Sequence, residues 1–112
     1  MPILTYAAEE LPVRVTSDTC DMYMVAAAKD GDHQAYAELC RRHSQQIFRT
    51  VLRITGNVAD AEYTLQEALL RAYVHIGAFE GRSAFSSWLT RIAINSALML
   101  SRKKRSQPNV QL

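Results

Sequence analysis

One segment of the chain, residues 86–105, gathers side chains that could bind a nucleic acid. It reads SSWLTRIAINSALMLSRKKR, contains the only tryptophan of the sequence, Trp88, and ends in four consecutive basic residues, Arg102, Lys103, Lys104 and Arg105. An indole can stack on an unpaired base, and ammonium or guanidinium groups can bind phosphates. The alternative is purely structural, because a tryptophan at a helix start often anchors a core, and cations in a last helical turn interact with the helix dipole and with water.

The charge distribution favours an anionic partner for the carboxy-terminal part of the chain. The 112 residues carry a formal net charge of +2. Residues 1–32 contain six acidic and two basic residues, whereas residues 33–112 contain five acidic and eleven basic ones. An excess of basic residues of this kind suits a ligand that carries phosphates.

Other features of the composition exclude several classes of protein. Cys20 and Cys40 are too few for a disulfide framework, and no signal sequence opens the chain. No uncharged run reaches the roughly 20 apolar residues that a membrane span needs. We therefore expect a soluble, cytoplasmic protein of one domain that does not contact a membrane.

The sequence contains no pattern typical of an enzyme. It has no paired carboxylates, nucleophile motif or glycine loop for phosphates, so we expect no catalytic residue, no cofactor and no enzyme activity. Cys20, His33, Cys40 and His43 could be imagined as a zinc site, but Cys20 and His33 are further apart than zinc-binding pairs usually are. We expect no metal site, and we expect His43 to face the core rather than to act as a pH switch.

Three turn signals divide the sequence into four predicted helices. DGD at residues 30–32, TGN at 55–57 and FEGRS at 79–83 each supply a glycine stop and a polar cap. The first helix is predicted to run from about Asp18, its cap, to Lys29. Residues 1–17, which include the β-branched stretch LPVRVT, are expected to form a loose tail, and residues 107–112 a linker or tail.

Apolar residues recur at intervals of three and four in the later helices, so each helix has a stripe that faces a core. Since such faces must bury one another, the sequence predicts an all-α fold, a compact bundle of about four helices spanning residues 18–106. The predicted core stripes are Tyr36, Leu39, Cys40, His43, Ile47, Val51 and Ile54; Ala61, Leu65, Ala68, Leu69, Ala72 and Ile76; and Phe85, Leu89, Ile92, Ala93, Ser96, Met99 and Leu100.

Two helices also have a second face that bundle packing does not use. On the third helix this face carries Tyr63, Glu67, Leu70 and Val74, so it is half apolar and suits either the middle of a bundle or another protein. On the fourth helix the outer face is polar and basic, with Trp88 at its border with the core stripe. The members of that outer face are Ser87, Arg91, Asn95, Arg102 and Arg105.

Residues from about Asp21 to Ser106 resemble region 2 of bacterial RNA polymerase sigma factors, specifically of the extracytoplasmic-function group. The resemblance lies in the order and spacing of VAAAKDGDHQAYAELCRRH, RITGNVADAEYTLQEALLRAY, FEGRSAFSSWLTRIAIN and RKKR. In that family the segment that matches residues 60–70 docks on the clamp helices of the β′ subunit of core RNA polymerase. The resemblance implies this role for Asp60, Glu62, Tyr63, Gln66, Glu67 and Leu70, with Tyr63 where the family commonly has an acidic residue.

The resemblance also implies a DNA site. In the family, the segment that matches residues 79–95 and the basic end recognises the −10 promoter element, melts it and captures a flipped base of the non-template strand. Opening costs on the order of 1.4 kcal/mol per base-pair step, and stacking of an exposed base, at about 1 to 3 kcal/mol, can offset it. The implied phosphate ligands are Arg82, Arg91, Arg102, Lys103, Lys104 and Arg105; the implied pocket residues are Phe79, Gly81, Ser83 and Asn95, with Trp88 near the base.

Two alternatives to promoter recognition stay open at the level of the sequence. The chain could be a helical adaptor that binds only proteins, or a decoy that keeps the sigma fold without reading DNA. An anti-sigma factor is an expected partner, because such proteins cover the surfaces that polymerase and promoter use. Family members carry a second helical domain, region 4, which RKKRSQPNVQL leaves no room for, so the chain is expected to be either one domain of a longer protein or a single-domain relative.

Overall fold

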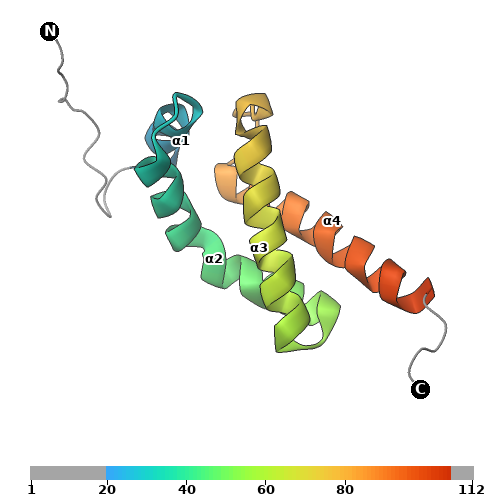
Figure 1. Ribbon diagram of the computed structural model, residues 1–112. Helices are drawn as coiled ribbons and strands as arrows, with labels where there is room; N and C mark the ends of the chain where they lie inside the picture. Colours follow the sequence, from blue (N-terminus) through green and yellow to red (C-terminus); the bar gives the residue numbers. More distant parts are fainter. Residues whose placement is uncertain (1–19, 107–112) are drawn as a thin grey trace, which may run out of the picture. The chain divides into compact units, whose positions relative to one another are not determined.

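The computed structural model describes residues 20–106, which form four α-helices, one short 3-10 helix and, within this range, no strand (Figure 1). The helices are α1 (Asp21–Lys29), α2 (His33–Thr55), α3 (Val58–His75) and α4 (Phe85–Ser106), with η1 (Ile76–Ala78) directly after α3. The predicted all-α fold with four helices is confirmed. The predicted tails at 1–17 and 107–112 lie outside the described residues. The prediction of Asp18 as the cap of the first helix is wrong, because the cap of α1 is Cys20, whose side chain makes no capping hydrogen bond.

The described residues form two compact units, which divide between Arg42 and His43. In the first unit, the turn between α1 and α2 depends on Gly31, whose φ of 98° lies in the left-handed region that favours glycine. Asp32 then caps α2, because its Oδ1 accepts hydrogen bonds from the backbone N–H groups of Gln34 and Ala35. The buried apolar residues of this unit are Met24, Val25, Ala28, Ala35, Tyr36 and Leu39.

A cluster of ion pairs ties α1 to α2 within the first unit. Arg42 donates to Asp21 of α1 over 3.1 Å and to Glu38 of its own helix over 3.0 Å. Arg41 binds the same Glu38 carboxylate. These two guanidinium groups, Arg41 first, lower the pKa of Glu38 from 4.5 to about 2.

In the second unit the end of α2 shares a core with α3 and α4. Helices α3 and α4 pack against each other, and several alanines of both are fully buried: Ala61, Ala68 and Ala72 of α3, and Ala93 and Ala97 of α4. Alanine side chains let two helix backbones approach closely. The larger members of this core include Ile47, Val51, Phe85 and Leu89.

The predicted core stripe on α4 is wrong at one residue, Met99. Met99 is 47% exposed, and Ala97, which the predicted stripe omitted, is fully buried instead. Ala97 follows Ala93 and Leu89 at intervals of four, so it continues their line, whereas Met99 lies two residues, or about 200°, further round the helix. The predicted core residues Cys40, His43, Ile54, Leu65, Leu69, Ile92 and Leu100 are partly buried.

Two hydroxyl groups in this core have no hydrogen-bond partner among the described residues. They are Oγ1 of Thr64 on α3 and Oγ of Ser96 on α4, and both residues are buried. A buried hydroxyl without a partner is destabilising relative to an apolar group of the same shape.

Candidate protein-binding face and nucleic-acid interface

An aromatic cluster joins the loop after η1 to the first turn of α4. The ring centroids of Phe79 and Trp88 are 5.0 Å apart, and those of Phe85 and Trp88 are 5.8 Å apart. Phe79 and Phe85 meet edge to face at 5.9 Å, and His43 of α2 lies 6.0 Å from Phe85. This packing fixes the indole of Trp88 from inside while part of it stays accessible, as the sequence predicted for a residue at the border of the core.

Phe79 was predicted to line the pocket that receives a base, but its side chain lies in the core. Its side chain is only 3% exposed, so it supports Trp88 and the loop from below and offers little surface to a ligand. A phenylalanine in a loop with glycine and charged neighbours gives no sequence periodicity from which such burial could be predicted.

Beside the cluster the surface has a hollow of about 190 Å³, formed by the loop and the start of α4. Gly81, with a φ of 81°, allows the loop to turn back. Arg82 and Glu80 form an exposed ion pair of 3.1 Å at the rim. The lining residues are Ala78, Phe79, Glu80, Arg82, Ser83, Trp88 and Arg91.

The hollow brings together four side chains that the sequence predicted as DNA ligands or pocket residues and that retain accessible surface: Arg82, Ser83, Trp88 and Arg91. It also contains Glu80, which was not among the predicted site residues although it stands between Phe79 and Gly81 in the FEGRS loop. Asn95 is exposed and lies one turn beyond Arg91 on α4. An aromatic platform with guanidinium groups at its edge can stack a base and bind its phosphates.

The basic end of α4 is exposed, but one of its cations is already engaged. Lys104 Nζ lies 2.5 Å from Asp60 Oδ2 in the first turn of α3, and Asn57 donates to the same oxygen over 2.9 Å. These two donors, Lys104 first, lower the pKa of Asp60. Asp60 and Lys104, predicted for two different partners, thus bind each other in this structure. Arg102, Lys103 and Arg105 are exposed around them.

The outer face of α3 is an unusually apolar surface for an exposed helix. Tyr63, Leu70 and Val74 are all exposed, Leu70 by 64%. Glu67 is partly buried between them and binds Arg71 over 3.0 Å. Arg71 first, and then the hydroxyl of Tyr63, lower the pKa of Glu67, and the bond to Glu67 raises the pKa of Tyr63. The phenol therefore acts as a hydrogen-bond donor at this position.

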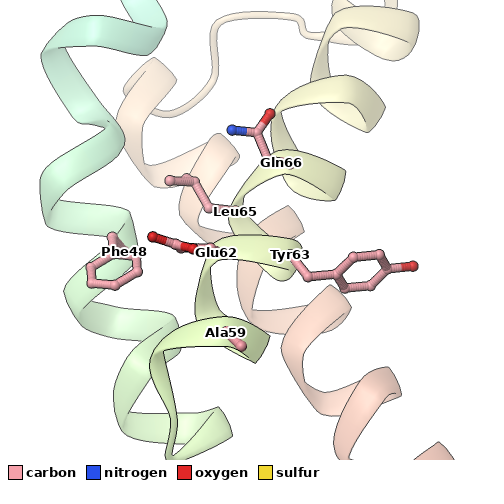
Figure 2. Close-up of a pocket in the computed structure, with 6 residues that line it drawn as sticks. All are labelled: Phe48, Ala59, Glu62, Tyr63, Leu65 and Gln66. Carbon is pink, nitrogen blue, oxygen red and sulfur yellow. The ribbon is translucent and has the colours of Figure 1, made fainter.

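Two shallow hollows flank this face of α3. One, of about 660 Å³, lies between α2 and α3 and is lined by Phe48, Ala59, Glu62, Tyr63, Leu65 and Gln66. Figure 2 shows Glu62 and Leu65 directed toward the side of Phe48, and Tyr63 directed away from it. The other hollow, of about 490 Å³, is lined by Tyr63, Gln66, Glu67, Leu70 and Arg71.

The two hollows beside the outer face of α3 are together lined by five of the six residues predicted to bind polymerase: Glu62, Tyr63, Gln66, Glu67 and Leu70. The sixth, Asp60, lies at the start of the helix and binds Lys104. Phe48 was missed, because it lies beside the apolar stripe of α2 and only the packing of α2 on α3 brings it to this surface.

Residues 20–106 contain no group of three or more His, Cys, Asp or Glu side chains placed to bind a metal ion. In the same range, none of the helices has the length and apolar character that crossing a membrane requires.

The sigma-70 region 2 family matches residues 39–107 of the chain. The ECF RNA polymerase sigma factor SigW of Bacillus subtilis is 40% identical over 81 residues, which cover 72% of this chain and 43% of SigW. The sigma factor SigM of Mycobacterium tuberculosis is 36% identical over 92 residues, which cover 82% of this chain and 47% of SigM. The chain therefore spans less than half the length of these relatives.

A solved structure has the same fold. It is the NMR structure of an engineered region 2 of sigmaE in complex with GTAAAA, with a TM-score of 0.72 and 27% sequence identity. The similarity covers 83% of this chain and 99% of that one. The fold, the order of the motifs and the relatives agree: the chain belongs to the sigma-70 region 2 family, in its extracytoplasmic-function group.

Proposed function

We propose that this chain binds core RNA polymerase through the outer face of α3 and captures the melted −10 promoter element with the loop and α4. The observation that carries the proposal is the presence of two different surfaces on one small helical unit. One is apolar with a few polar groups, on α3, and the other combines an accessible indole with exposed guanidinium groups.

The α3 face has the character of a protein-binding surface. Leu70 and Tyr63 expose large apolar areas, and the partly buried Glu67 and the exposed Gln66 supply polar groups beside them. Protein interfaces commonly combine a few exposed anchors of this kind with a polar rim. We assign this face to the clamp helices of the β′ subunit. An anti-sigma factor that covers the same face is a second proposed partner, and the cytoplasm is the proposed location.

The loop and α4 suit the non-template strand. Trp88 provides the stacking surface and Arg82 and Arg91 lie at the edge of the same hollow. The basic end of α4 begins 14 residues beyond Trp88, which at 1.5 Å per residue is about 21 Å along the helix. A ligand that touches both must extend along α4, as a single strand can. Capture of a base needs binding energy and no covalent step.

The polymerase contact is tested by measuring the affinity of the chain for bacterial core RNA polymerase by fluorescence anisotropy. Leu70→Ala and Gln66→Ala should each weaken binding by about 5-fold or more, because truncation of an interface anchor commonly costs more than 1 kcal/mol. Leu98→Ala is the matched control, since Leu98 is an exposed leucine on α4 and should bind as the native chain does. Equal affinities for all four proteins would contradict the assignment of the α3 face.

The alternative of an adaptor or decoy makes a different prediction. Such a protein would bind polymerase or a regulator without any preference among single-stranded −10 sequences. Its binding to DNA would depend on charge and salt alone. Sequence preference in the presence of polymerase therefore separates the two functions.

A further inference from the structure

We call the hollow beside Trp88 the base pocket. A second hollow lies next to it, between the carboxy-terminal half of α2 and the start of α4. It has a volume of about 410 Å³ and is lined by Gln46, Ser86, Ser87, Thr90, Arg91 and Ile94. Arg91 lines both this hollow and the base pocket, so the two sites are adjacent. We call the second hollow the hydroxyl cleft.

The chemistry of the hydroxyl cleft is that of a polar ligand site without acidic groups. Three hydroxyls, one carboxamide and one guanidinium group meet there, and no carboxylate lines it. Over residues 20–106, the structure gives the side chains of Gln46, Ser86, Thr90 and Arg91 no hydrogen bond or ion pair with protein. Arg41, Arg42, Arg71, Arg82 and Lys104, by contrast, all bind carboxylates. The polar groups of Gln46, Ser86, Thr90 and Arg91 are therefore available to a ligand.

We propose that the hydroxyl cleft binds the nucleotide next to the captured base, and that Gln46 of α2 reads its base. This inference rests on the proposed function, because it needs a strand in the neighbouring pocket. The hollow is open to solvent and adjoins that pocket through Arg91, which can hold the phosphate between the two nucleotides. Ile94 and the methyl group of Thr90 supply an apolar surface for the ring.

The hydrogen-bonding groups of the Gln46 carboxamide indicate which base the cleft prefers. It presents one donor and one acceptor side by side, and this pair matches N7 and the exocyclic amino group of adenine. The hydroxyl of Thr90 can donate or accept a further bond. We therefore expect adenine at one position adjacent to the captured base, and we expect that preference to depend on α2, a helix outside the segment of residues 79–105 that the sequence indicated for DNA.

The test compares Gln46→Ala with Gln45→Ala, which removes the same side chain one residue away, where it does not line the cleft. Both positions are exposed on a helix, so alanine should preserve the fold. Each protein is mixed with core polymerase and titrated with fluorescent single-stranded −10 oligonucleotides that vary one base at a time. Thr90→Val, which removes only the hydroxyl at nearly constant shape, is the third variant.

We expect the native chain and Gln45→Ala to prefer adenine at one neighbouring position, and Gln46→Ala to lose about 5-fold or more of that preference. Thr90→Val should lose part of it, while selection at the captured base stays unchanged in all variants. If the native chain is selective and Gln46→Ala has the same profile, the inference is wrong and the proposed function stands. If the native chain selects no sequence at any position, the proposed function is wrong and the inference with it.

Discussion

The buried position of Phe79 leads to a prediction that separates support of the pocket from contact with the ligand. The ring is 3% exposed and packs on Phe85 and Trp88 at 5.9 and 5.0 Å. Replacement of a buried phenylalanine by alanine costs about 3–5 kcal/mol. A chain of this length has a free energy of unfolding of about 5–15 kcal/mol, so Phe79→Ala should remove about a fifth of it or more.

Phe79→Leu should cost less, about 1–2 kcal/mol, because it keeps most of the volume and loses only the aromatic contacts. The assay is urea unfolding followed by helical circular dichroism and by the fluorescence of Trp88, the only tryptophan. Val74→Ala, at a site 66% exposed, is the control and should change stability by about 0.5 kcal/mol or less. A cost below about 1 kcal/mol for Phe79→Ala would refute the reasoning, since the ring would then not be part of the core.

Three further predictions concern the scaffold. Asn57→Ala removes the cap bond to the N–H of Asp60 (2.8 Å) and should lower the free energy of unfolding by about 0.5–2 kcal/mol in urea; no loss would contradict the cap. Thr64→Val replaces a buried hydroxyl that has no partner and should leave stability equal or up to about 1 kcal/mol higher, whereas a clear loss would mean that the hydroxyl is bonded. Glu38 has a pKa lowered to about 2, so its stabilising effect is complete above its ordinary value of 4.5 and disappears as the pH falls toward 2. In thermal unfolding from pH 5 to pH 2, the native chain should therefore lose more stability than Glu38→Gln, and parallel curves would contradict the ion-pair cluster.

The helices could be predicted from the sequence because their signals are local. The glycine turns near Gly31, Gly56 and Gly81 separate the observed helices as expected. The stripe of Leu89 and Ala93 is buried, as a period of 3.6 residues predicts. Signals of this kind depend only on neighbours in the chain, so they do not need knowledge of the packing.

The details of the site depend on contacts between distant parts of the chain, and these have no local signal. Lys104 and Asp60 are 44 residues apart, and only the packing of α3 against α4 brings them together. Phe48 and Gln46 reach their hollows because α2 lies beside α3 and α4 in the second unit. The side chain of Phe79 is buried by the return of its loop onto Trp88. Residue types and the family resemblance together predicted which side chains could bind DNA, but not which of them share a pocket.

The proposed function requires that the loop and α4 select a −10 strand when polymerase is bound. The most direct test is fluorescence anisotropy of the native chain, Trp88→Ala and Arg91→Ala with a set of single-stranded −10 oligonucleotides, with and without core polymerase, and with Lys29→Ala as a control for the loss of one exposed cation. We predict selective binding that requires polymerase, is retained in Lys29→Ala and is lost in the Trp88 and Arg91 variants. Equal binding of every oligonucleotide, with both variants indistinguishable from the native chain, would contradict promoter recognition and leave a domain that binds polymerase alone.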